Sequence, residues 1–267
     1  MKDITSADNP TLKALKALLT AKGRQEQGLF LAEGPHLAQE ALRSGAQIIV
    51  VAVAQSARER YAALVEQCQA LGAQVLLFSD RLLEGLCDTR TPQGIVVATR
   101  IPARSLEEPA LAAGRLAVVL ENLQDPGNLG TILRTALAVN ADFTLLCGGA
   151  DPWSPKVVRA SQGAVFHLPI VETAVSPEKT AAGAIVQLRT SGWHCACAHL
   201  AGGDFFFRPR HDRTALLIGN EGAGVSAGAA AACDGLYRLP MGEHAESLNA
   251  AVAAGIMLYD LWREQLQ

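Results

Sequence analysis

Three polar side chains recur at every third position of the segment NLGTILRTALAVN, residues 128–140. This spacing predicts a helix with Asn128, Thr131 and Arg134 in one polar stripe and with Asn128 as its N-cap, after a turn at residues 125–127. An arginine near the carboxyl end of a strand is well placed to bind a phosphate or a carboxylate. An exposed arginine on an ordinary capped helix explains the same residues, so both interpretations stay open at this point.

A second candidate is the glycine-rich loop at residues 219–224, GNEGAG, which follows the apolar strand TALLI. Glycines allow a ligand to approach the backbone closely, or allow positive φ. Glu221 would repel a phosphate, but it suits a ribose hydroxyl, a cationic ligand or a pair with an arginine. A P-loop is excluded because no Gly-Lys-Ser/Thr follows, and the G-x-G-x-x-G pattern is also missing. A tight turn without a ligand is the alternative.

The third candidate is SLNAAVAAGIMLY, residues 247–259. It predicts a helix with Ser247 as N-cap and Asn249 in the first turn. Its small residues allow close packing of the backbone. Gly255 costs about 1 kcal/mol relative to alanine inside a helix, so a packing reason for it is expected. The two polar residues are either helix caps or members of a site.

Two further patterns resemble a metal site and a hydrolase motif, but their context disfavours both. His194, Cys195, Cys197 and His199 could be metal ligands, but strand alternation places His194 on the opposite face from the other three, so no metal site is expected. Ser226 lies in a G-x-S-x-G pattern typical of hydrolases. It follows a glycine loop where that motif requires a strand, which disfavours a hydrolase.

The elements that must position these residues alternate between strands and helices. Strands are predicted at 47–53, 73–79 and 94–99, and again at 115–123, 142–148, 193–200, 214–220 and 235–241. Helices are predicted at 11–23 and 57–72 as well as at the two segments above. This order predicts an α/β fold, with a mostly parallel sheet covered by helices on both faces and a smaller α/β domain before it. Residues 101–115, with two prolines and mixed charge, predict a linker.

Composition narrows the class of protein. The chain has 267 residues, of which 49% are hydrophobic and 18% charged, with a net charge of -3. It can therefore bury a large core, and neither disorder nor a polybasic tail is expected. The acidic balance argues mildly against non-specific coating of nucleic acid. Basic residues gather in the first 24 positions, so any surface that binds phosphate should include this part.

Cysteines and hydropathy indicate the compartment. The six cysteines are scattered without C-x-x-C spacing, which indicates a reducing cytosol. We find no apolar signal core at the N-terminus and no apolar run long enough to span a bilayer. A soluble cytoplasmic protein is therefore expected, with neither a membrane nor a metal as partner.

Taken together, NLGTILRTA, IGNEGAGV and LPM…SLNAAVAAGIMLY resemble, in this order and spacing, the three motifs of the SpoU (TrmH) family of RNA 2′-O-ribose methyltransferases in the SPOUT superfamily. The segments NPTLKALKALLTAKGR and GLFLAEG look like the substrate-binding extension of its ribosomal-RNA members. The resemblance implies an RNA substrate-binding domain at 1–100, a linker at 101–115 and a catalytic domain at 116–267. It also implies a deep C-terminal trefoil knot, which general fold rules would not suggest.

The resemblance further implies S-adenosyl-L-methionine as the methyl donor. The residues expected to bind it are Gly219, Asn220, Gly222, Leu239, Met241, Leu248, His199 and Leu200. The catalytic residues carried over are Arg134, Asn128, Glu221, Ser247 and Asn249. By the family pattern Arg134 activates the ribose hydroxyl. Because a guanidinium keeps its protons, we expect Arg134 to bind the target phosphate and stabilise the developing alkoxide, with Glu221 fixing its orientation.

The implied partner is RNA, most directly large-subunit ribosomal RNA, with Lys13, Lys16, Lys22 and Arg24 as candidate contacts. For each of these four residues an ordinary solvated surface position is the alternative. Alternative functions are a transfer-RNA 2′-O-methyltransferase, a non-catalytic RNA-binding ribosome assembly factor and, with less support, another nucleotide-binding α/β enzyme. A homodimer with the last helix at its interface is also implied. The chain departs from the family in the charged loop 242–246, where Glu243 stands at a position that is glycine in many members.

Overall fold

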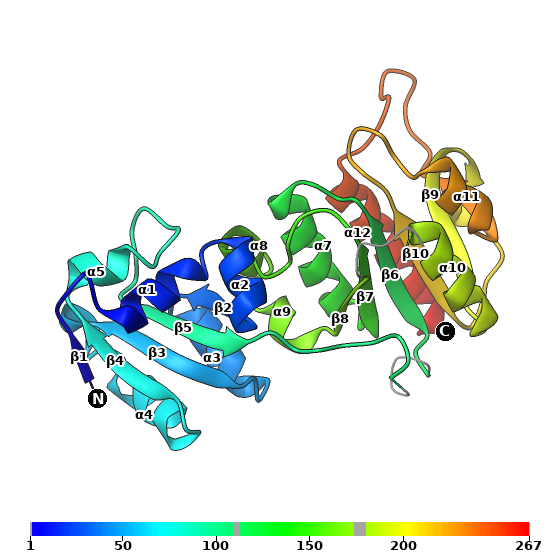
Figure 1. Cartoon of the computed structure of the whole chain (residues 1–267). Coiled ribbons are helices and arrows are strands. Elements are labelled where there is room, and N and C mark those ends of the chain that lie inside the picture. Colours follow the sequence, from blue (N-terminus) through cyan, green and yellow to red (C-terminus); the bar gives the residue numbers. More distant parts are fainter. Residues whose placement is uncertain (1, 109–112, 174–179, 267) are drawn as a thin grey trace. The chain divides into compact units, whose positions relative to one another are not determined.

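The computed structural model describes residues 2–108, 113–173 and 180–266. The chain forms two compact units (Figure 1). The first comprises Met1–Pro102 and Asp151–His167, and the second comprises Ala103–Ala150 and Leu168–Gln267. The chain therefore leaves the second unit after residue 150 and returns to it at residue 168. This excursion, residues 151–167, falls within the range 116–267 that the resemblance implies for the catalytic domain.

The first unit contains a five-stranded sheet in the order β1-β4-β3-β5-β2. β1, β4 and β3 are parallel to one another, whereas β5 is antiparallel to both β3 and β2. The strands are β1 Lys2–Ile4, β2 Leu29–Glu33, β3 Ile48–Ala54, β4 Gln74–Phe78 and β5 Ile95–Arg100. The helices are α1 Pro10–Ala17, α2 Ala21–Gln27, α3 Pro35–Arg43, α4 Ala62–Ala70 and α5 Asp80–Glu84, with α8 Pro155–Ala160 and α9 Ala164–His167 from the excursion. A 3-10 turn, Gln55–Ala57, precedes α4, so the helix predicted from residue 57 begins later.

The helix predicted over residues 11–23 is in fact two helices, α1 and α2. Thr20 caps α2, and its hydroxyl accepts a hydrogen bond from the N–H of Gly23 at 3.1 Å. Gly23 was expected to end the helix, but it lies inside α2. A Cβ at this position would overlap the carbonyl of Ala17. Glycine is therefore required at residue 23 because two helices approach closely there.

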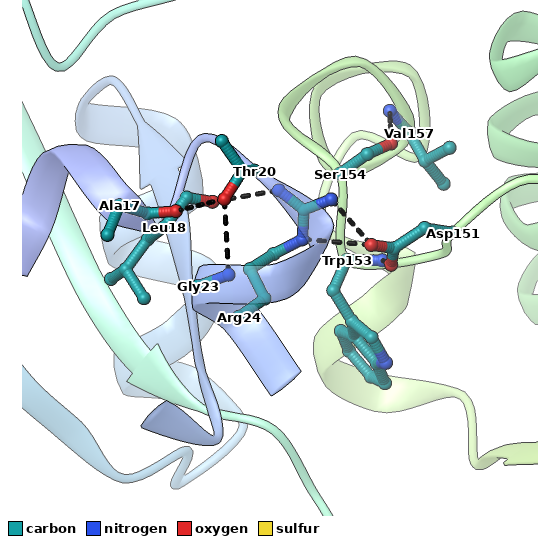
Figure 2. A network of polar contacts seen from close by, with 9 residues as sticks. All are labelled: Ala17, Leu18, Thr20, Gly23, Arg24, Asp151, Trp153, Ser154 and Val157. Carbon is teal, nitrogen blue, oxygen red and sulfur yellow. Dashed lines mark hydrogen bonds and ion pairs between the residues drawn. The ribbon is translucent and has the colours of Figure 1, made fainter. Parts of the chain in front are cut away.

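Arg24 is buried, with 4% of its surface exposed, and it holds the excursion through an ion pair (Figure 2). Its Nε and Nη2 donate to Oδ2 of Asp151 at 2.9 and 2.5 Å, and its Nη1 donates to the carbonyl of Leu18 at 2.8 Å. The other oxygen of Asp151 accepts from the backbone N–H of Trp153 at 2.8 Å. The Trp153 ring packs on Phe30 of β2, with 5.0 Å between centroids. Polar and apolar contacts together therefore keep residues 151–167 in the first unit.

This burial corrects one predicted RNA contact. All three lysines in the predicted set are exposed, and ion pairs join Lys13 to Asp8 and Lys22 to Glu26. Arg24 is different, because all three nitrogens of its guanidinium donate to protein acceptors and the side chain is shielded from solvent. The prediction of an RNA contact at Arg24 is therefore wrong.

The second unit contains a six-stranded parallel sheet in the order β11-β9-β10-β6-β7-β8. The strands are β6 Leu116–Glu121, β7 Phe143–Cys147, β8 Ile170–Glu172, β9 His194–Asp204, β10 Thr214–Ile218 and β11 Gly235–Arg238. The helices are α7 Pro126–Ala138, α10 Ala181–Thr190, α11 Ala227–Ala232 and α12 Ala250–Gln265, and a 3-10 turn, Phe205–Phe207, follows β9. The predicted α/β fold with a parallel sheet and a smaller preceding domain is confirmed.

Strand alternation divides the core of this unit into two layers. Val119 of β6 and Leu217 of β10 belong to one buried cluster together with Ile185 and Leu188 of α10. The alternate residues of the same two strands point to the opposite face of the sheet. On that face α7 and α12 pack together (Figure 1). A Cβ at Gly255 of α12 would lie 3.9 Å from Thr135 of α7, an ordinary contact. The expected steric reason for this glycine is therefore not found among the residues that the structure describes.

Among the described helices, none combines the length and the apolar character that crossing a bilayer requires.

We predict that Arg24→Ala lowers the free energy of unfolding by about 2–4 kcal/mol, because it leaves the partly buried Asp151 carboxylate without its charged partner. Urea unfolding followed by tryptophan fluorescence measures this loss, with Lys22→Ala on the same helix expected to change stability by less than about 0.5 kcal/mol.

Replacing both partners, in Arg24→Met with Asp151→Leu, should recover most of the loss, because the two charges disappear together. Equal stability of Arg24→Ala and Lys22→Ala would contradict the assigned role of the ion pair.

Candidate active site

The loops that follow β6 and β10 are tied together by Glu221. These strands are parallel neighbours, so their carboxyl ends meet at one edge of the sheet. One oxygen of Glu221 accepts from the backbone N–H of Gln124 at 3.1 Å, and the other from that of Asp125 at 3.0 Å. The amide of Asn128 donates to the same carboxylate at 3.1 Å. Glu221 therefore holds the first turn of α7 against the glycine loop.

Asn249 joins this network from the start of α12. Its Nδ2 donates to Oδ1 of Asn128 at 2.9 Å. Three of the predicted catalytic residues, Asn128, Glu221 and Asn249, are therefore connected by direct hydrogen bonds although 121 residues separate Asn128 from Asn249.

The helix caps differ from the prediction in both motifs. Asp125, not Asn128, caps α7, and its carboxylate accepts from the N–H of Asn128 at 2.7 Å. Asn249, not Ser247, caps α12 and accepts from the N–H of Ala251 at 2.9 Å. The structure thereby leaves the Asn128 side chain available for the network, while Ser247 is exposed and lines the neighbouring cavity.

Arg134 lies six residues after Asn128 on α7 and is exposed. In the described part of the chain it has no hydrogen bond or ion pair. The expected pairing with Glu221 is therefore not formed, because Gln124, Asp125 and Asn128 occupy that carboxylate. The guanidinium is free to bind a ligand that approaches α7 from solvent.

The Glu221 carboxyl is held in its ionised form. Partial burial acts to raise its pKa, but hydrogen bonds from the N–H groups of Gln124 and Asp125 and from the Asn128 amide outweigh this effect. The pKa of Glu221 consequently lies below its ordinary value. Glu221 thus keeps a negative charge at neutral pH.

The glycine loop is shaped by Gly219 and Asn220. A Cβ at Gly219 would overlap the backbone of Gly224, so the loop could not close on any larger residue. Asn220 Oδ1 accepts from the N–H groups of Gly222 and Ala223, each at 2.9 Å, and its Nδ2 donates to the carbonyl of Asn122 at 2.9 Å. Gly224 has φ of 69°, where glycine is favoured. The loop is therefore rigid through its own contacts.

Ser226 has a structural role in this loop. Its N–H and hydroxyl both donate to Glu121 at the end of β6, at 2.8 and 2.6 Å, and its hydroxyl also caps α11. Ser226 is therefore held as a cap and a link between strands, with no arrangement typical of a nucleophile. Sequence reasoning missed Glu121, whose only signal was its position near the end of the strand predicted at 115–123.

A cavity of about 460 Å³ opens beside the glycine loop, a size typical of small-molecule sites. Its wall includes all eight residues predicted to bind the methyl donor: His199, Leu200, Gly219, Asn220, Gly222, Leu239, Met241 and Leu248. Glu221 and Ser247 also line it. Three further lining residues, Tyr237, Arg238 and Glu246, were not predicted, although each is adjacent in sequence to a motif. The cavity offers apolar surface, backbone polar groups and charged side chains to one ligand.

The cysteine and histidine pattern in β9 does not form a site. Cys195 and Cys197 are buried in the core beneath α10, and burial raises the pKa of the Cys195 thiol to about 12. His194 stacks on His211, with 3.6 Å between ring centroids, while His199 lines the cavity. Within the described ranges, no group of three or more potential ligand residues is placed to hold a metal ion.

Comparisons with known proteins agree with this geometry. Residues 115–259 match the SpoU rRNA Methylase family, and residues 9–97 match the MRM3-like substrate binding domain. The 23S rRNA (guanosine(2553)-2′-O)-methyltransferase RlmP of Bacillus subtilis is 35% identical over 263 residues, covering 98% of this chain and 99% of that protein. The 23S rRNA (uridine(2479)-2′-O)-methyltransferase of Streptomyces viridochromogenes is 33% identical, covering 72% of this chain and 68% of that protein.

Solved structures extend the similarity to the whole chain. An AdoMet-bound rRNA methyltransferase from Sinorhizobium meliloti has a TM-score of 0.88 at 33% identity, covering 100% of this chain and 99% of that one. The SpoU methyltransferase AviRb from Streptomyces viridochromogenes, in complex with AdoMet, has a TM-score of 0.87 at 29% identity, covering 97% of this chain and 99% of that one.

We predict that Gly219→Ala destabilises the protein by about 1–3 kcal/mol, because the added methyl group overlaps the backbone of Gly224. Gly222→Ala is the matched control, since a Cβ there meets only Oδ1 of Asn220 at 3.6 Å. Thermal unfolding gives the stability of both variants. Hydrogen exchange at the Asn220 and Gly224 amides, which pair with each other across the loop, should accelerate in Gly219→Ala alone. Equal behaviour of the two variants would contradict the steric argument.

Proposed function

Because this chain belongs to the SpoU (TrmH) family of RNA methyltransferases, we propose that it transfers a methyl group from S-adenosyl-L-methionine to a ribose 2′-hydroxyl in large-subunit ribosomal RNA. One observation carries the proposal. Hydrogen bonds among Glu221, Asn128 and Asn249 join the glycine loop, which lines the cavity, to α7, which carries Arg134, and to the start of α12.

The residues of the cavity fit the methyl donor. Backbone groups around Gly219, Leu239 and Leu248 can hold a nucleoside, since adenine offers edge groups for hydrogen bonds and a flat face for apolar contact. Charged side chains at the same cavity suit a ligand that also carries the ammonium and carboxylate groups of an amino acid. When bound, S-adenosyl-L-methionine supplies an electrophilic methyl group on its sulfonium.

Arg134 is proposed to act on the RNA. A guanidinium keeps its protons at the pH at which proteins work, so Arg134 is not the base that takes the hydroxyl proton. Its planar fork can bind the phosphate of the target nucleotide and stabilise negative charge on the 2′-oxygen as the hydroxyl proton passes to water. Ser247, exposed at the cavity, is proposed to orient the ribose. Asn128, Glu221 and Asn249 would act by positioning these groups.

The ribosomal substrate is preferred over transfer RNA for two reasons. The relatives named above act on 23S rRNA, and the first unit matches a substrate-binding domain. We propose that this unit captures RNA with exposed cations such as Lys13, Lys16 and Lys22. A non-catalytic assembly factor would have no need for Arg134, Glu221, Ser247 and Asn249, the motif residues that this chain retains.

We also propose that the protein is a cytoplasmic homodimer with a knotted C-terminal segment, as the family resemblance implies. Support for the dimer comes from α12 and the residue two positions before it. Leu248, Val252, Ile256 and Tyr259 follow one another at helical spacing and are 38–51% exposed. A continuous apolar stripe of this kind is typical of a surface that another molecule covers.

We predict that Arg134→Lys lowers the rate of methyl transfer to 23S rRNA by about 100- to 1,000-fold, because lysine keeps the charge but loses the bidentate fork. The dissociation constant for S-adenosyl-L-methionine, measured by calorimetry, should change by less than about twofold, since Arg134 does not line the cavity.

The cellular test is a map of 2′-O-methyl positions in ribosomal RNA. Cells that lack the protein should lose one methylation, and wild-type protein should restore it where Arg134→Lys does not. An unchanged map in the deletion strain would overturn the proposed function, while near-normal turnover of Arg134→Lys would overturn the role of the guanidinium.

We predict that Val252→Glu and Ile256→Glu each convert the homodimer to a monomer, because a carboxylate would be desolvated at the interface. Light scattering measures the mass in solution. Val186→Glu is the control, because Val186 on α10 is also 51% exposed but lies outside the stripe. A monomeric wild-type protein would contradict the proposed dimer.

A further inference from the structure

Three charged side chains line the cavity beside the glycine loop. Two are carboxylates, Glu221 and Glu246, and one is the guanidinium of Arg238. They come from three separate segments: the loop after β10, the end of β11 and the loop before α12. The cavity wall therefore carries one more negative charge than positive charge.

The charges of Glu246 and Arg238 are not used by the fold. Glu246 is exposed and, across the residues that the structure describes, forms no hydrogen bond or ion pair. Arg238 likewise has no such partner in the described ranges. Asp204, which faces Arg238 in the pairing of β9 with β11, accepts a hydrogen bond from the N–H of Phe206 at 2.9 Å and forms no ion pair with it. The side chains of Glu246 and Arg238 are therefore both available to bind a ligand.

Glu221 contributes a fixed negative charge to the same wall. The hydrogen bonds that it accepts lower its pKa, so the carboxylate persists at neutral pH. These bonds also make Glu221 a structural residue, whose replacement would disturb the loops around it. Glu246 differs because its charge can be removed without breaking a contact within the protein.

The charges of the proposed methyl donor are the complement of this wall. S-adenosyl-L-methionine carries a sulfonium, an ammonium and a carboxylate, which makes two positive charges and one negative. Its demethylated product, S-adenosylhomocysteine, has a neutral thioether and therefore only one charge of each sign. In the product complex one carboxylate of the wall would remain without a positive partner.

Building on the proposed function, we propose that the cavity selects the methyl donor over its demethylated product by charge, with Glu246 as the residue that sets this selectivity. A carboxylate at the wall attracts the sulfonium, and because Glu246 is exposed this attraction is modest and screened by solvent. It disappears when the methyl group leaves, because the sulfur is then neutral. Release of the product is thereby favoured after each turnover.

The charged loop 242–246 thus gains a role. Glu246 lines the cavity, whereas Glu243 in the same loop does not. The two carboxylates differ by three positions and are both exposed, so they form a matched pair for an experiment. Arg238 supplies a second comparison, because the carboxylate that it would bind is present in both ligands.

The test is isothermal titration calorimetry of the full chain with S-adenosyl-L-methionine and, separately, with S-adenosylhomocysteine. The measured quantity is the ratio of the two dissociation constants, product over donor. We expect Glu246→Gln to lower this ratio by about 5- to 10-fold, mainly by weakening donor binding, and Glu243→Gln to change it by less than about twofold. Arg238→Gln should weaken both ligands equally and leave the ratio unchanged.

The effect of Glu246 should shrink at high ionic strength, because salt screens a charge that is open to solvent. A ratio that is the same in Glu246→Gln and in the wild type would overturn the inference while leaving the proposed function intact. An equal change in Glu243→Gln would overturn the assignment to Glu246. Failure of the wild type to bind either ligand at millimolar concentration would overturn the proposed function itself.

Discussion

The candidate site depends on one carboxylate. Glu221 accepts hydrogen bonds from the backbone N–H groups of Gln124 and Asp125, the two residues immediately before α7. Since β6 and β10 are adjacent and parallel, their loops emerge side by side, and a single carboxylate can bridge them. Through Asn128 the same group also reaches Asn249 at the start of α12. The three motifs are thereby held in one arrangement.

This arrangement separates residues that build the site from residues that remain free. Asn220 and Gly219 close the glycine loop on itself, and Ser226 links it to Glu121. Arg134 and Glu246, in contrast, have no partner among the described residues. A ligand can bind charged side chains that have no partner within the protein, because its binding breaks no existing contact.

The Arg24–Asp151 pair shows that a charged residue can be far in sequence from the residue that pairs with it in the fold. Arg24 follows a run of exposed lysines, and its sequence neighbourhood suggests a surface that binds RNA. Asp151, 127 residues later, neutralises it inside the first unit. The excursion of residues 151–167 has no local signature, because its turns and short helices look like any α/β connection. Trp153 and Phe30 were visible in the sequence, but not their contact.

The sequence by itself determined the α/β class, the order of most strands and the three motifs, because hydrophobic periodicity and glycine spacing are local properties. The resemblance to the SpoU family named eight further residues, and all of them line one cavity. Only the tertiary structure decided which polar residue caps which helix, that Glu221 binds backbone N–H groups in preference to Arg134, and that Arg24 is buried. Each of these depends on which donors and acceptors the packing of distant segments brings within hydrogen-bonding distance, and no local pattern encodes that distance.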